Sequence, residues 1–224
     1  MSIHQGHRER LRERFIRQGL NGFNELNALE LLLFYAIPRK DTNPIAHALL
    51  ERFGSLAAVF EATQQELEQI PGVGENAASL ICLLPQMMRR AAVSKAENIH
   101  ILKDTKTAGE YLRPKLLYER EEVVLLVCLD SRKRVINCVE LSRGLANSVS
   151  VSVRKLVEFA VLERSDAIIL AHNHPSGYAM PSIEDRNFTL QAKQALATVG
   201  ISLADHFIVT DGECVSMAEM NFMP

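Results

Sequence analysis

The sequence predicts two structural parts, an all-helical N-terminal domain followed by a mixed α/β (α+β) domain. Helix caps and helix stops recur through the first part of the chain, without a run that favours β-structure. Beyond residue 100, runs rich in Val, Ile and Leu alternate with helical patterns, as in α/β and α+β folds. The mixed polar stretch 91–100 is the predicted linker. We therefore place a helical domain at residues 1–95 and an α/β domain at residues 101–224.

Composition limits the functional classes. A chain of 224 residues with 47% hydrophobic residues can form one large domain or two small ones around sizeable cores. The formal net charge of −2 gives no global electrostatic reason to bind nucleic acid, although a local basic patch remains compatible with it. Four scattered cysteines without a CxxC pair predict free thiols in a reducing compartment. The polar N-terminus is unlike a signal peptide, and no apolar run is long enough to span a membrane, so we expect a cytoplasmic protein without membrane association.

The N-terminal helices are predicted from local signals. Asn27 with Glu30, and Thr63 with Glu66, have the spacing of a capping box, and Pro44 suits the first turn of a helix. The predicted helices cover residues 7–18, 27–34, 43–53, 55–61, a short segment after Thr63, and an apolar segment ending at about Arg90.

The segment Ile70-Pro71-Gly72-Val73-Gly74 is typical of a helix-hairpin-helix motif. Glycines in such a hairpin let backbone amides approach a phosphate at a helix N-terminus, although they also suit tight helix packing. Glu75 opposes phosphate binding, whereas the arginines between Arg8 and Arg17 favour it. Residues 1–95 therefore have two open interpretations, DNA contact and protein interaction.

The second part of the chain contains the predicted sheet. Residues 122–129 and 134–141 form a predicted hairpin around a turn at 130–133, and the continuous apolar run 166–172 predicts a buried strand. The remaining predicted elements are an alternating stretch at 148–152, helices at 153–164 and 183–199, and strands at 201–210 and 214–217.

The end of the buried strand carries a candidate metal site. His172 and His174 point to the same side of the strand because side chains alternate, and Asp185 falls in the first turn of the next helix. Two imidazoles and a carboxylate are a ligand set of catalytic zinc sites that keep a position open for water. We therefore predict one Zn²⁺ per chain, bound by these three residues.

Two further residues are candidates for catalysis. Glu140, at the end of the second hairpin strand, is the predicted general base for a zinc-bound water. Ser182 is the predicted hydrogen-bond donor to an oxyanion. Each also has a structural interpretation: Glu140 as a solvated strand residue, and Ser182 as the N-cap of the helix that contains Asp185.

The order His172-x-His174-Pro175, then Ser182-x-x-Asp185, with Glu140 upstream, resembles the JAMM motif of MPN/JAB-domain metalloproteases. The segments 140–144, 171–177 and 205–212 resemble the bacterial RadC family, and this likeness extends over nearly the whole chain. The resemblance implies a JAB fold, a sheet flanked by helices and related to cytidine deaminases, after a helix-hairpin-helix region. It also implies zinc ligation by His172, His174 and Asp185, a base at Glu140 and an oxyanion helper at Ser182. The family carries a DNA-repair label, but that label does not identify a biochemical reaction.

The sequence thus supports a zinc metallopeptidase that cleaves a peptide or isopeptide bond of an unidentified protein substrate. The alternative is a non-enzymatic module that binds DNA or protein through residues 1–95. The letters His172-Asn173-His174 also spell the name of a nuclease motif, but that motif spreads its residues over a longer ββα unit. His206 is interpreted either as a partly buried structural residue or as a residue that supports the site or contacts the substrate.

Overall fold

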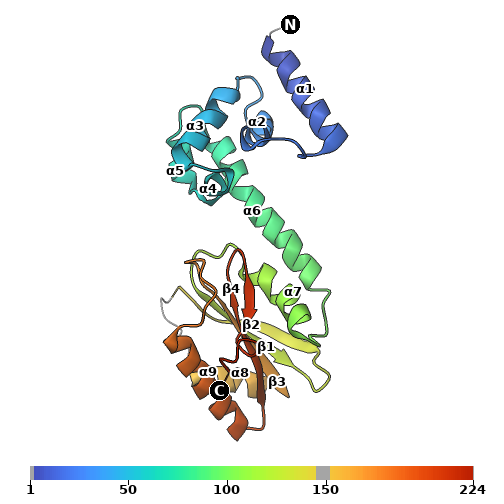
Figure 1. Ribbon diagram of the computed structural model, residues 1–224, viewed down its shortest axis with the longest axis vertical. Helices are drawn as coiled ribbons and strands as arrows, with labels where there is room; N and C mark the ends of the chain where they lie inside the picture. The colour runs from blue at the N-terminus through green and yellow to red at the C-terminus, as the bar shows by residue number, and fades with distance from the viewer. Residues whose placement is uncertain (1–2, 145–151, 224) are drawn as a thin grey trace. The chain divides into compact units, whose positions relative to one another are not determined.

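A computed structural model of the chain describes residues 3–144 and 152–223 (Figure 1). The chain forms two compact units, Met1–Met88 and Arg89–Pro224. The division falls inside a long helix, α6 (Glu75–Ala96), so the first residues of the expected linker at 91–100 are helical. Most of the alternating stretch expected at 148–152 lies outside the described residues.

The first unit is helical, as predicted. Its helices surround a core that includes the fully buried Leu33, Leu49 and Ile81. The helices are α1 (Ile3–Gln18), α2 (Glu25–Ala36), α3 (Asn43–Phe53), α4 (Leu56–Glu61), α5 (Gln64–Glu68) and the beginning of α6.

The predicted caps at Ser55 and Thr63 are confirmed, and Thr63 forms a complete capping box with Glu66. The cap predicted at Asn27 is wrong. Helix α2 begins two residues earlier, because the side chain of Asn24 accepts a hydrogen bond of 2.8 Å from the Asn27 backbone amide. Glu30 is fully buried and hydrogen-bonds to His7.

The α5–α6 hairpin depends on Gly72. Its φ of +94° lies in the left-handed region, and a Cβ atom there would come within 2.9 Å of Ile45 Cδ1. The backbone amide of Val73 donates to the carbonyl of Ile70 at 3.0 Å and closes the turn. The sequence Pro-Gly-Val-Gly thus forms a tight connection between two helices.

The second unit is built on a five-stranded mixed sheet with the order β2-β1-β3-β4-β5. Strand β1 pairs antiparallel with β2 and β3, β3 pairs parallel with β4, and β4 pairs antiparallel with β5. The strands are β1 (Val123–Leu129), β2 (Val135–Arg143), β3 (Ala167–Asn173), β4 (Ser202–Val209) and β5 (Cys214–Ser216).

Helices cover both faces of this sheet (Figure 1). Helices α8 (Val153–Leu162) and α9 (Ile183–Thr198) pack on one face, around Leu126, Leu156 and Leu170. Helix α7 (Thr105–Leu116) packs on the other face with Leu112. The predicted hairpin, buried strand and helices of this unit are confirmed within one to two residues, but α7 has no counterpart in the sequence-based expectation.

Two general expectations can be compared with the structure. All four cysteines lie within the described residues, and none of them forms a disulfide bond there. Within residues 3–144 and 152–223, no helix combines the length and apolarity needed to cross a membrane.

Candidate metal centre

Strand β3 and helix α9 bring the three predicted ligands together. His172 lies opposite Val124 of β1, on the face of the sheet that α9 covers. His174 follows β3, and Asp185 is in the first turn of α9. One possible ligand atom from each of the three residues lies within 4.8 Å of the others, so the group can hold a metal ion.

The distances show a converging set of donor atoms. His172 Nε2 lies 2.9 Å from His174 Nε2. Asp185 presents Oδ1 at 3.3 Å from His172 Nε2 and Oδ2 at 3.5 Å from His174 Nε2. His172 and Asp185 are almost completely buried, whereas the side chain of His174 is 17% exposed. The site is therefore closed on one side and open to solvent at His174.

The hydrogen bond of His174 fixes its tautomer. Its Nδ1 lies 2.8 Å from the carbonyl oxygen of Tyr178, which can only accept. A neutral His174 must therefore carry its proton on Nδ1, and this leaves a lone pair on Nε2. Metal-binding histidines are commonly oriented in this way through the nitrogen that does not bind the metal. The donor set fits a zinc ion.

Asp185 is ionised in this environment. Burial alone would raise its pKa, but hydrogen bonds with His172 and His174 outweigh burial and hold the pKa well below its usual range. The hydrogen bond with Asp185 in turn raises the pKa of His174, against the effect of burial. The two imidazoles therefore stabilise the buried carboxylate, and the carboxylate stabilises the charged form of His174.

Ser182 occupies the N-cap of α9. Its hydroxyl donates to Asp185 Oδ2 at 2.6 Å, and its oxygen accepts from the Asp185 amide at 3.0 Å. Ser182 and Asp185 thus form a capping box that orients the carboxylate. The structure shows the capping interpretation of Ser182, and the oxyanion role stays a prediction.

Glu140 does not join this group. It lies opposite Leu125, so its side chain projects from the face of the sheet that α7 covers, whereas His172 projects from the α9 face. Its carboxylate is 42% exposed and pairs with Arg143 at 2.8 Å. Val139 and Leu141 on either side pack into the core beneath α8 and α9, so Glu140 lies on the opposite side of β2, and its role as general base stays a prediction.

Glu122 is the carboxylate that faces the cluster. It precedes β1 and lies two residues before Val124, which pairs with His172. Burial raises the pKa of Glu122, the charge of His172 lowers it, and the charge of Asp185 raises it again. Glu122 is half-buried, so solvent reaches part of its side chain, and its pKa responds to the charges of the ligand group. No local sequence pattern indicates this position of Glu122, because it arises from the pairing of β1 with β3.

Asn173, between the two histidines, fixes the backbone around Glu122. Its side chain points away from the metal ligands, accepts from the Val123 amide at 2.7 Å, and donates to the carbonyl of Glu121 at 2.9 Å. It also donates to the carbonyl of Glu119 at 3.2 Å. Sequence reasoning missed this role, which connects the end of β3 to the start of β1.

His206 of β4 lies behind His172. It is buried, and its Nε2 lies 2.9 Å from His172 Nδ1. Its Nδ1 lies 2.7 Å from the hydroxyl of Thr189 in α9. Burial, followed by the charge of His172, holds the pKa of His206 well below its ordinary value, so this residue is neutral.

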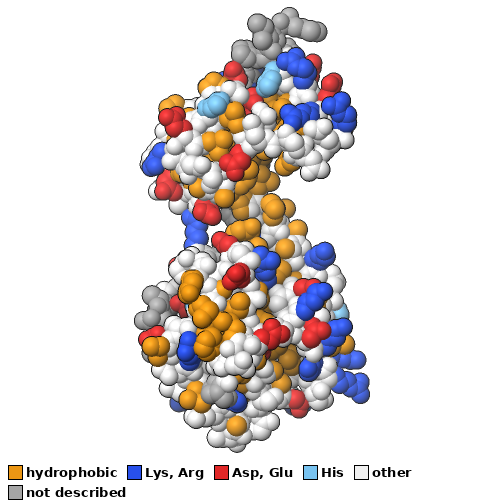
Figure 2. Space-filling view, viewed as in Figure 1, with side chains coloured by type: hydrophobic (Ala, Val, Ile, Leu, Met, Phe, Trp, Pro, Cys, Tyr) orange, Lys and Arg blue, Asp and Glu red, His pale blue; other side chains and the backbone are white. Residues whose placement is uncertain are grey.

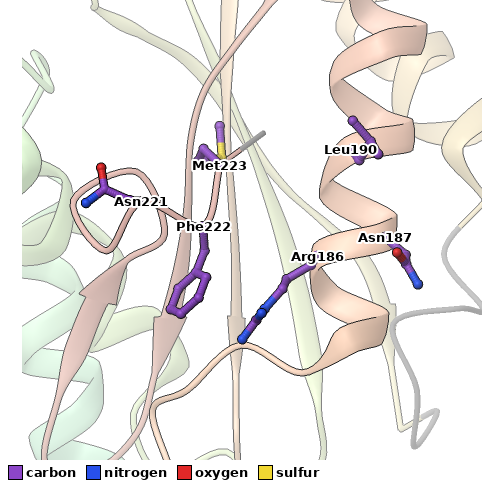
Figure 3. Close-up of a pocket in the computed structure, with 6 residues that line it drawn as sticks. All are labelled: Arg186, Asn187, Leu190, Asn221, Phe222 and Met223. Carbon is purple, nitrogen blue, oxygen red and sulfur yellow. The ribbon is translucent and has the colours of Figure 1, made fainter.

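A separate pocket lies between α9 and the C-terminal residues (Figure 3). Arg186 extends toward Phe222 there, with its guanidinium carbon 4.0 Å from the ring centre. None of the predicted metal ligands lines this pocket, which is bounded by Arg186, Asn187, Leu190, Asn221, Phe222 and Met223.

Comparison with known proteins agrees with the fold and the motif. The family model described as the RadC-like JAB domain matches residues 102–222. The chain belongs to the RadC family. A UPF0758 protein of Fusobacterium nucleatum is 38% identical over 222 residues, covering 96% of each chain. A UPF0758 protein of Shewanella loihica is 36% identical over 95% of this chain and 94% of its own length. A UPF0758 protein of Bordetella petrii is also 36% identical, over 96% of each chain. The RadC match spans most of the second unit, including every candidate ligand.

Proposed function

We propose that this RadC-family chain is a zinc-dependent hydrolase of the JAMM type, which cleaves a peptide or isopeptide bond in a protein substrate. The single observation that carries the proposal is the convergence of His172 Nε2, His174 Nε2 and the Asp185 carboxylate. With the tautomer of His174 fixed by the Tyr178 carbonyl, this arrangement directs lone pairs toward one point. Lone pairs that converge in this way repel one another, and a bound divalent cation relieves that repulsion.

The residues around the ligands have separable roles in this proposal. A bound zinc supplies Lewis acidity and lowers the pKa of a coordinated water to about 7. Glu122 replaces Glu140 as the proposed general base, because it faces the cluster and its half-buried carboxylate can accept a proton and pass it to the leaving amine. Ser182 orients Asp185, and it acts on an oxyanion only if its hydroxyl turns from Asp185 toward the substrate.

A pair of matched variants tests these roles. Glu122→Gln is expected to bind zinc at wild-type stoichiometry and to lose about 10²–10⁴-fold in hydrolysis, since it keeps the shape but loses the base. Glu140→Gln is the control and should retain both. Metal content is measured by elemental analysis, and cleavage by mass spectrometry of randomised peptides and of peptides joined through a lysine side-chain amide. Full hydrolysis by Glu122→Gln would remove that residue from the base role.

The second candidate function, DNA binding by the helical unit, has two favourable observations. The α5–α6 hairpin is formed, with Gly72 in the left-handed conformation. Lys and Arg side chains also gather over α1 (Figure 2). However, Arg8 donates to the carbonyls of Ile37 and Pro38, so part of this charge serves the fold.

Salt dependence distinguishes this candidate from a protein-interaction role. Binding that neutralises phosphates weakens steeply as salt concentration rises. The full chain is titrated with a fluorescent DNA duplex at 50 and 200 mM salt as a probe of that dependence. An affinity for DNA that is absent, or that does not change with salt, contradicts the DNA-binding proposal.

A further inference from the structure

Three hydrogen bonds connect one proposed metal ligand to the backbone of another. The first joins His172 Nδ1 to His206 Nε2, and the second joins His206 Nδ1 to Thr189 Oγ1. The third joins Thr189 Oγ1 to the carbonyl oxygen of Asp185. The three distances are 2.9, 2.7 and 2.5 Å. All four residues are buried, so water does not compete for these groups.

The direction of the protons follows from the last bond. The Asp185 carbonyl can only accept, and two oxygens 2.5 Å apart require a proton between them. The single proton of Thr189 therefore points at that carbonyl, although the Met217 sulfur lies 3.8 Å away as a weaker acceptor. The Thr189 oxygen must then accept from His206 Nδ1.

This order of protons determines which ring nitrogen of His206 and of His172 carries a proton in the relay. His206 is buried, and its ring nitrogens contact an imidazole and a hydroxyl instead of a carboxylate, so it is neutral. With its proton on Nδ1 it has a lone pair on Nε2, which can only accept. His172 must therefore donate from Nδ1. When His172 is neutral, as metal binding requires, its lone pair is on Nε2, the atom directed at His174 and Asp185. The Tyr178 carbonyl has the same effect on His174, because it holds the proton of that imidazole on Nδ1 and leaves the lone pair on Nε2.

We propose that His206 and Thr189 are positioning residues that set the tautomer of His172 and thereby make its Nε2 a metal ligand. The inference rests on the proposed metal site but not on the identity of the substrate. It assigns His206 a role for which packing alone does not account. Because the relay ends on the backbone of Asp185, it also ties the first turn of α9 to strands β3 and β4.

Removal of the Thr189 hydroxyl tests this relay without touching a ligand side chain. In Thr189→Val, His206 Nδ1 loses its acceptor, and the tautomer with a proton on Nε2 becomes favoured. His206 then no longer accepts from His172, which protonates on Nε2 instead. Zinc affinity, measured on the full chain by competition with a chromophoric chelator, should fall about 10- to 100-fold. Thr189→Ser should restore wild-type affinity.

A control variant and a spectroscopic measurement separate this inference from a structural effect. Thr198→Val removes a hydroxyl that also donates to a carbonyl of α9 but is exposed, and its zinc affinity should be unchanged. Long-range ¹⁵N–¹H NMR of the wild-type chain should show His172 and His206 each protonated on Nδ1. His206 protonated on Nε2, or undiminished zinc affinity in Thr189→Val, overturns the relay.

The two proposals fail in different ways. If the wild-type chain binds no zinc, the proposed function is wrong, and the NMR tautomers still decide whether the relay has the proposed direction. If the wild-type chain binds zinc and Thr189→Val binds it equally well, the metal site stands and the relay is wrong.

Discussion

At the scale of single residues, position relative to the sheet decides which polar side chains belong to the centre. His172 and Glu122 lie on the face that α9 covers, whereas Asn173 and Glu140 project from the other face. Asn173 nevertheless affects the centre, because it holds the backbone on both sides of Glu122. Neighbouring residues in the chain thus have different roles: His172 is a proposed metal ligand on one face of the sheet, and Asn173 supports the backbone on the other.

Asn173→Ala is expected to lower the free energy of unfolding of the second unit by about 1–3 kcal/mol, because it leaves the buried Val123 amide without a partner and removes the amide that donates to two part-buried carbonyls. Hydrolysis should also fall, since Glu122 loses its support, whereas zinc stoichiometry should persist. Denaturant unfolding and metal analysis give these values. Asn137→Ala, which removes a partly buried amide from β2, is the control. A fully active, equally stable Asn173→Ala chain contradicts this role.

At the scale of elements, the hairpin between α5 and α6 depends on one glycine and not on the next. Gly72→Ala places a methyl group 2.9 Å from Ile45 and forces a left-handed conformation, so we expect a loss of about 2–4 kcal/mol in the helical unit. Gly74→Ala meets no atom within 4 Å and should cost less than about 1 kcal/mol. Hydrogen exchange of the α3 and α6 amides measures both values. Equal losses of stability in the two variants would show that the hairpin does not depend on the left-handed conformation of Gly72.

Most elements were predictable because their signals are local. Ser55 and Thr63 cap their own helices, and the buried run of β3 lies within one short segment. Helix α7 was missed although Asp104 and Thr107 form a capping box, since Gly109 and Pro114 interrupt its helical pattern. The three candidate ligands could be selected from the sequence because His172, His174 and Asp185 share one motif, and the structure brings them together.

The proposed base, Glu122, could not be predicted in the same way. The approach of Glu122 to His172 depends on the antiparallel pairing of β1 with β3, across about fifty residues of chain, and no local spacing encodes it. The alternation of Val139 and Leu141 did contain the signal that Glu140 faces away, because both neighbours pack toward α9.

At the scale of the whole molecule, the metal centre belongs to one of the two compact units. Its three ligands, and the residues that support them, come from residues 89–224. Zinc binding should therefore stabilise that unit alone. At a free zinc concentration of 100 Kd the expected gain is about 2.7 kcal/mol.

Hydrogen exchange of the full chain, with zinc and after chelation, measures this coupling. Protection should increase in β3, β4 and α9 when zinc is added, and amides in α2 and α3 should be unchanged, because they lie in the other unit. An equal increase of protection in both units would show that the units act as one cooperative body.

The central claim is that His172, His174 and Asp185 form a zinc site. X-ray absorption at the zinc edge, combined with elemental analysis of the full chain, tests it most directly. The account predicts one zinc per chain, with two imidazole nitrogens at about 2.0–2.1 Å and a first shell completed by oxygen. It also predicts loss of the metal in His174→Ala. A chain that binds no zinc, or one whose zinc keeps the same first shell in His174→Ala, contradicts the account.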